Sequence, residues 1–144
     1  MNILEHDFIR VVSSGKITNS SNAIEEISVA THGLNATAIN VLGKQLQWDA
    51  VVMAKAIGTT VRTLERHKQD KKPLGIKLSE NALELARLST IGIAYFGNIK
   101  RWNEWLNTPN AQFDNKEPKA VVHTIRGREL IKRIIRGLEY GFTA

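Results

Sequence analysis

The chain contains no cysteine among its 144 residues. This absence excludes disulfide bridges, thiolate nucleophiles and zinc sites built from cysteine ligands. Long apolar runs are missing as well, because polar residues such as Thr31, Asn35 and Asn40 interrupt the longest uncharged stretch, Ile27 to Gly43. Burying these polar groups in a bilayer would cost too much solvation energy. We therefore expect no membrane-spanning segment.

The sequence also lacks the motifs of catalysis, metal binding and cofactor binding. Its four histidines are far apart, and none lies three or four residues from another, as a metal-binding pair on one helix face requires. The stretch Ser13-Ser14-Gly15-Lys16 lacks the leading glycine and the spacing of a phosphate-binding loop. The neighbouring acids Glu25 and Glu26 point to different helix faces. We therefore expect no metal and no cofactor, and a protein that is not an enzyme.

The first residues give no sign of export. They contain Glu5 and Asp7 where a secretory signal has basic residues, and no apolar segment follows them. A cytoplasmic location is therefore expected.

The hydrophobic fraction of 42% and the charged fraction of 24% are typical of a globular chain. The net charge is +6, which favours polyanionic or acidic partners. This excess is concentrated in residues 48–77, where seven basic side chains face three acidic ones. The segment ends in the charged stretch Lys68 to Gly75, which contains proline and glycine and predicts a linker. We therefore predict one domain at residues 1–77 and a second at 78–144.

The pattern of apolar residues predicts an all-α fold. Asn22 and Glu25 form a capping-box pattern at the start of one helix, and Gly33 marks its end. The other helices are expected from Asn35 to Leu42, from Trp48 to Ile57, from Thr60, from Ser79 to Phe96, from Ile99 to Leu106 and from Ile125 to Leu138.

Residues 51–66 have the pattern of a helix-turn-helix. Ala54 is small enough for two helices to cross closely, Gly58 permits a left-handed turn, and Thr60 is a good cap for the second helix. Leu64 is expected to pack inward. Arg62 and Arg66 lie one helical turn apart, so that both can reach the same stretch of DNA.

The second helix is therefore our predicted DNA-binding element, the partner is operator DNA, and a homodimer is expected because such proteins read paired half-sites. Its predicted contacts are Thr60, Val61, Arg62, Thr63, Arg66 and Lys68. An ordinary helical hairpin with solvated arginines remains an alternative at this point.

The C-terminal half carries more specific motifs. In order, they are Leu78-Ser79-Glu80, Tyr95-Phe96-Gly97, Trp105-Leu106-Asn107-Thr108-Pro109-Asn110, Pro118 and the final stretch from Gly137 to Ala144. Together with the helix-turn-helix pattern, this order resembles the Xre/MbcA/ParS antitoxins. Two positions depart from the family: Thr59 replaces a usually apolar residue of the turn, and the loop before Pro118 lacks the usual glycines. Asn115 can adopt the left-handed conformation in their place.

The resemblance implies an antitoxin that binds a RES-domain toxin, an enzyme type that destroys NAD, and represses its own operon. It also implies that the C-terminal tail blocks the active site of the toxin. Aromatic side chains in the tail are suitable interface anchors, and the carboxylate of Ala144 is suited to a cleft built for phosphates. The predicted toxin-binding residues are Arg133, Arg136, Glu139, Tyr140, Gly141, Phe142 and Ala144.

Less specific interpretations accompany each of these predictions. The tail aromatics can instead fold back onto the last helix, and the basic side chains of that helix can form a solvated face. The alternative function is a sequence-specific repressor with a dimerisation domain and no toxin partner.

Overall fold

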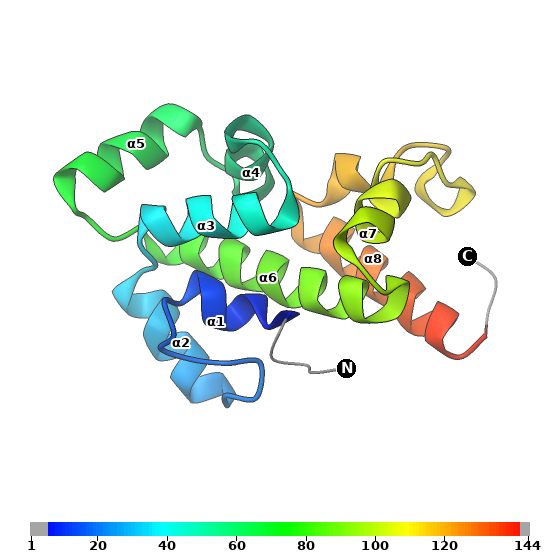
Figure 1. The fold of residues 1–144 in the computed structure, drawn as a ribbon, viewed down its shortest axis with the longest axis horizontal. Helices are drawn as coiled ribbons and strands as arrows, with labels where there is room; N and C mark the ends of the chain where they lie inside the picture. Colours follow the sequence, from blue (N-terminus) through cyan, green and yellow to red (C-terminus); the bar gives the residue numbers. More distant parts are fainter. Residues whose placement is uncertain (1–5, 142–144) are drawn as a thin grey trace. The chain divides into compact units, whose positions relative to one another are not determined.

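The computed structural model describes residues 6–141, and within this range the chain is all-α, as predicted (Figure 1). Short 3-10 helices and one isolated bridge, between Asn110 and Lys116, accompany eight α-helices in these residues. The elements are α1 Phe8–Val12, α2 Ala23–His32, α3 Ala36–Leu46, α4 Ala50–Ile57, α5 Val61–Asp70, α6 Ile76–Phe96, α7 Ile99–Leu106, η2 Ala111–Phe113, η3 Pro118–Val121 and α8 Ile125–Glu139.

The chain divides into two compact units, and the division falls inside α6, between Arg87 and Leu88. The boundary expected at residues 77 and 78 lies in the first turn of this helix instead. The stretch from Lys68 to Gly75, predicted as a linker, completes α5 and then runs as an ordered connection. Leu74 in this connection is buried, and its N–H donates a hydrogen bond to the carbonyl of Leu34 at 2.8 Å.

The N-terminal unit is organised around α3, which contacts α1, α4 and α5. Ile39, Leu42 and Leu46 project from α3 into the core and are fully buried. The predicted end of this helix at Leu42 is wrong, because α3 continues through Gly43 to Leu46. Gly43 lies inside the helix rather than at its end, and an added Cβ would lie 3.2 Å from Cγ of Met53, a tight contact that this side chain would have to relieve.

The start of α6 also differs from the prediction. Ser79 was expected to cap this helix, but the helix begins at Ile76 and Ser79 is buried within it. Its hydroxyl accepts a hydrogen bond from the N–H of Leu34 at 3.0 Å and donates one to the carbonyl of Leu74 at 3.4 Å. A polar residue that suits a helix cap therefore joins two distant segments of the N-terminal unit.

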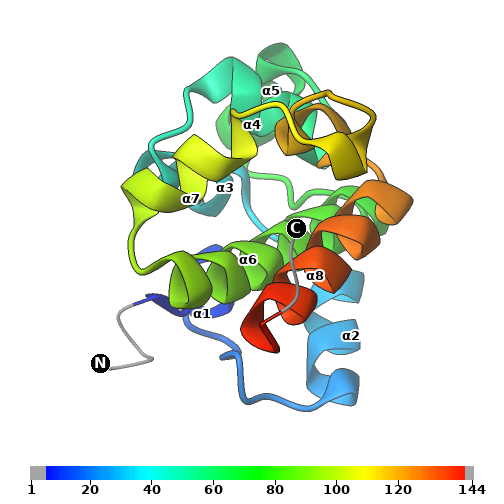
Figure 2. The ribbon, with the colours of Figure 1, turned by 90° about the vertical axis from the view of Figure 1, so that its right-hand side faces the viewer.

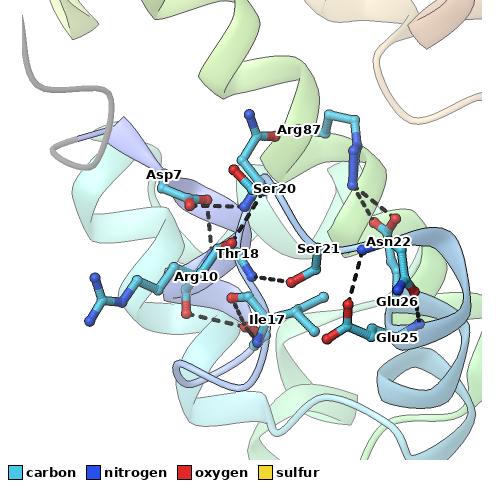
Figure 3. A network of polar contacts seen from close by, with 12 residues as sticks. Asp7, Arg10, Ile17, Thr18, Ser20, Ser21, Asn22, Glu25, Glu26 and Arg87 are labelled. Carbon is cyan, nitrogen blue, oxygen red and sulfur yellow. Dashed lines mark hydrogen bonds and ion pairs between the residues drawn. The ribbon is translucent and has the colours of Figure 1, made fainter.

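Polar contacts hold the N-terminal segments of this unit in place (Figure 3). Asp7 caps α1, because its carboxylate accepts a hydrogen bond from the N–H of Arg10. The same carboxylate also accepts a hydrogen bond from the N–H of Asn19. The predicted capping box of Asn22 and Glu25 is confirmed at the start of α2. The Nη2 atom of Arg87 of α6 lies 2.8 Å from both carboxylate oxygens of Glu26 of α2, a charge-assisted contact that links the two helices.

The C-terminal unit combines the last turns of α6 with α7, η2, η3 and α8 (Figure 2). Trp102 of α7 is fully buried and lies directly against Gly92 of α6. A Cβ added at Gly92 would lie 2.5 Å from the indole ring, which is closer than real Cβ contacts allow. Glycine at this position is therefore a requirement of helix packing.

Aromatic rings extend from this contact toward the following loop. Trp105 stacks on Trp102 with centroids 5.9 Å apart and planes 11° apart, and its ring also meets the edge of Phe113 at 5.9 Å. The loop after η2 turns through Asp114 and Asn115, both in the left-handed conformation. The prediction that Asn115 takes this conformation is confirmed.

Of the helices within residues 6–141, none combines the length and the apolar character needed to cross a bilayer.

Replacing Gly92 with alanine should destabilise the protein. Alanine is the better helix former by about 1 kcal/mol, but its methyl group would press on the indole ring of Trp102. We expect the clash to outweigh that gain and to lower the free energy of unfolding by about 1–3 kcal/mol in urea denaturation. In a Trp102→Phe background, whose smaller ring relieves the clash, Gly92→Ala should cost less. Equal costs in both backgrounds would contradict this account.

Candidate functional site

The turn between α4 and α5 has the local geometry that the sequence predicted. Gly58 ends α4 in the left-handed conformation, with φ of 90°. Thr60 caps α5, because its hydroxyl oxygen accepts a hydrogen bond from the N–H of Thr63 at 3.2 Å. Ala54 and Leu64 are buried, which places them between the helices as expected. The turn thereby fixes the direction in which α5 leaves α4.

The outer face of α5 presents Arg62 and Arg66 to solvent, one turn apart. Neither guanidinium group forms an ion pair with any residue between 6 and 141. Val61 and Thr63 are half-buried, so they are less available on this face than the arginines. Unpaired guanidinium groups at this spacing can contact phosphates or guanine edges.

Lys68 does not share the face of these arginines. It follows Arg66 by two residues, which corresponds to a rotation of about 200° around the helix axis. It lines a pocket with His67, Lys71 and Lys72. The structure therefore brings five of the predicted DNA contacts to the start and outer face of α5 and places Lys68 elsewhere.

The last helix, α8, divides its residues between the core and the surface. Ile131, Ile134 and Ile135 are buried, whereas Arg133 and Arg136 are exposed. The Nη1 atom of Arg136 lies 3.3 Å from both carboxylate oxygens of Glu139. Both side chains are partly open to solvent, so this pair contributes little to stability and can rearrange around a partner.

An exposed aromatic residue, Tyr140, follows the last residue of α8. The side chain of Tyr140 is 80% exposed, so this aromatic residue does not fold back onto the helix. Gly141 follows in the left-handed conformation, with φ of 83°, and its N–H donates a hydrogen bond to the carbonyl of Leu138. The other predicted tail contacts, Phe142 and Ala144, lie outside the described residues.

Arg128 is an exception within the basic run of α8. It is only 5% exposed, and its Nη1 donates a hydrogen bond to the carbonyl of Val122 at 3.2 Å. Gly127 beside it is equally constrained, since an added Cβ would collide with the carbonyl oxygen of Val121. The run is therefore not a single solvated face, and Arg128 is a structural residue.

Sequence reasoning missed the exposed edge of the aromatic cluster. Tyr95 is 38% exposed and packs edge-on against Phe96 at 4.9 Å. Trp105 is half-exposed. Aromatic side chains that are partly open to solvent are typical of protein interfaces. The spacing of apolar and basic residues along the sequence does not distinguish these partly exposed aromatic residues from buried ones.

Within residues 6–141, no group of three or more histidine, aspartate or glutamate side chains is arranged to hold a metal ion.

Residues 92–141 match the family model of the antitoxin Xre/MbcA/ParS C-terminal toxin-binding domain. The match covers α7, η2, η3 and α8 together with the end of α6, and it includes Arg133, Arg136, Glu139, Tyr140 and Gly141. A comparison with curated proteins finds no match to this chain. The resemblance inferred from the C-terminal motifs is thereby confirmed for this segment.

Mutations can distinguish the structural role of the buried Arg128 from the role of the exposed basic residues of α8. Arg128→Met should lower the free energy of unfolding by about 1–3 kcal/mol, because the carbonyl of Val122 loses a charged donor. Arg126→Met removes the same charge from an exposed site in the same turn and should change stability by less than about 0.5 kcal/mol. Denaturant unfolding of the two variants measures this difference, and equal losses would contradict a structural role.

Proposed function

We propose that this protein, whose residues 92–141 are an Xre/MbcA/ParS-type antitoxin toxin-binding domain, neutralises a RES-type NAD-degrading toxin in the cytoplasm. Neutralisation occurs by binding rather than by catalysis: residues at the end of α8 occupy the active site of the toxin and exclude its substrate.

The observation that carries this proposal is the exposure of Tyr140 at the end of the toxin-binding domain. An aromatic ring left in water is a suitable anchor for a partner, because its burial stabilises a complex strongly and costs little conformational entropy. Gly141 follows this ring directly in the left-handed conformation, so the helical path of α8 does not continue through it. Arg133 and Arg136 are the cationic contacts beside it.

A second activity, binding of operator DNA, is favoured by the outer face of α5. Its two unpaired arginines sit in the most basic part of the sequence, and the helix is fixed by the capped turn after α4. A homodimer would present two such helices to paired half-sites, so that the antitoxin represses its own operon.

The alternative is a repressor with a C-terminal dimerisation domain and no toxin partner. The two functions differ in what the end of α8 does. In an antitoxin, changes at Tyr140 abolish protection against the toxin and leave DNA binding intact. A RES-type open reading frame beside the gene would support the antitoxin, and its product is the protein to use in the binding experiments.

Tyr140→Ala should weaken toxin binding at least about tenfold, since it removes an anchor whose burial is worth more than about 1.4 kcal/mol. Calorimetric titration against a catalytically inactive toxin measures this affinity, and survival of toxin-expressing cells provides a second readout. Ile125→Ala is the matched control, because it truncates a similarly exposed apolar residue at the opposite end of α8. Full protection by the Tyr140 variant would refute the proposed contact.

Replacing both Arg62 and Arg66 with alanine should weaken operator binding and reduce the slope of log K against log salt by about 2, because two phosphate-reaching charges are lost. The control is Lys100→Ala with Arg101→Ala, which removes the same charge from exposed positions of α7. Fluorescence anisotropy at several salt concentrations gives both slopes. If the arginine variant retains the slope of the unmodified protein, α5 is not the DNA-binding helix.

A further inference from the structure

The N-terminal unit contains a pocket of about 430 Å³ that the proposed functions do not use. Its walls come from the turn after α1, the end of α2, the beginning of α3 and the end of α5 with the connection that follows it. Figure 1 shows this connection passing the junction of α2 and α3, where Leu74 donates its hydrogen bond to Leu34. The pocket is thus formed by segments that the fold brings together from distant parts of the sequence.

Four lysines and two histidines are among the residues that line the pocket. They are Lys16, His32, His67, Lys68, Lys71 and Lys72. Of the aspartates and glutamates between residues 6 and 141, none lines the pocket. Among residues 6–141, none of the four lysine ammonium groups forms an ion pair. Asp70 is close in sequence, but it is exposed and does not contribute to the walls.

The negative partial charges at the carbonyl ends of the neighbouring helices offset only part of this positive charge. The carbonyl ends of α2 and α5 each carry about half a negative charge, which favours some basic residues beside them. The two carbonyl ends together carry a charge of about −1, whereas the pocket contains four lysines. The amino end of α3 adds a positive charge of about 0.5. An excess of positive charge therefore remains within a concave site, where low-dielectric walls strengthen its attraction for an anion.

Further hydrogen-bond donors face the same pocket. Ala36 and Thr37 in the first turn of α3 line it, and their N–H groups have no acceptor among residues 6–141. The N–H groups of a helix N-terminus bind phosphate and similar anions. By contrast, the N–H groups of Ser13 to Lys16 are all bonded to backbone carbonyls, so this turn provides no backbone cradle. An anion would be held by lysine charges and by the start of α3.

The histidines are oriented by backbone carbonyls. The Nδ1 atom of His32 lies 2.8 Å from the carbonyl oxygen of Ser28, and Nδ1 of His67 lies 3.4 Å from that of Lys72. A carbonyl only accepts, so in this arrangement the proton is assigned to Nδ1. Nε2 of the neutral ring is then an acceptor, so these rings supply no hydrogen bond to an anion and the lysines carry its binding.

We propose that this pocket binds a free small molecule that carries phosphate groups. Phosphate is the anion that combines several negative charges with strong acceptor oxygens, and lysine is a common point-charge partner for it. The volume lies in the range of small-molecule sites, about 300–1,000 Å³. Lys68 is turned by about 200° from Arg66 around the helix axis, so the pocket and the arginine face lie on different sides of α5.

The test is calorimetric titration of the full chain with sodium pyrophosphate at constant ionic strength. The unmodified protein should show saturable binding with one pyrophosphate per chain. Lys71→Gln with Lys72→Gln should weaken binding at least tenfold. The matched control, Lys44→Gln with Lys55→Gln, also removes two exposed lysines, but from outside the pocket, and should leave the affinity unchanged.

The absence of saturable binding, or an equal loss in the control, would overturn the proposal. Lys16→Gln provides an independent variant from another wall, with the same expected weakening, if the double variant does not fold.

Two further measurements identify the source of the phosphate. Arg62→Ala with Arg66→Ala should bind pyrophosphate normally, whatever its effect on DNA. Operator DNA should not displace pyrophosphate, and displacement would assign the pocket to the DNA backbone and overturn a free ligand.

Discussion

Trp102 and Gly92 approach so closely that no side chain fits between α7 and α6 in the C-terminal unit. This contact lets the indole ring become fully buried, and the ring in turn supports Trp105, which packs at a steep angle against Phe113 of η2. Aromatic rings bury large areas, and offset stacked or edge-on pairs add further attraction. A single missing Cβ therefore allows the aromatic packing that holds the unit together, and the toxin-binding domain match begins at this glycine.

Within that unit, α8 has a buried side and an exposed side. Ile131, Ile134 and Ile135 are buried and Arg128 is held by the carbonyl of Val122, so the helix is anchored along one side. Arg136 and Tyr140 remain open to solvent on the surface. A binding residue on a packed helix is positioned before its partner arrives, which reduces the entropy lost on association. The same helix can therefore be rigid and still offer an exposed aromatic anchor at its end.

Helical geometry places the positively charged side chains of the N-terminal unit on two different surfaces. Arg62 and Arg66 share the outer face of α5, whereas Lys68 turns into the pocket beside α3. Net charge alone predicted one polyanionic partner for this segment. Because successive residues rotate by about 100° around a helix, neighbouring basic residues can serve two different surfaces. We propose ligands of different size for the two surfaces, DNA for the arginine face and a small phosphate-bearing molecule for the pocket.

Local sequence rules correctly predicted the all-α class, the capping box of Asn22 and Glu25, the left-handed Gly58 and the Thr60 cap. These features depend on residues within about one helical turn, so they can be inferred from neighbours in the sequence. The C-terminal motifs likewise identified the toxin-binding domain. Only the tertiary structure placed Gly43 inside a helix, buried Ser79 and Arg128, and turned Lys68 into the pocket. Each of these outcomes depends on contacts between segments that lie apart in sequence, as when Ser79 meets Leu34, and local patterns carry no information about such contacts.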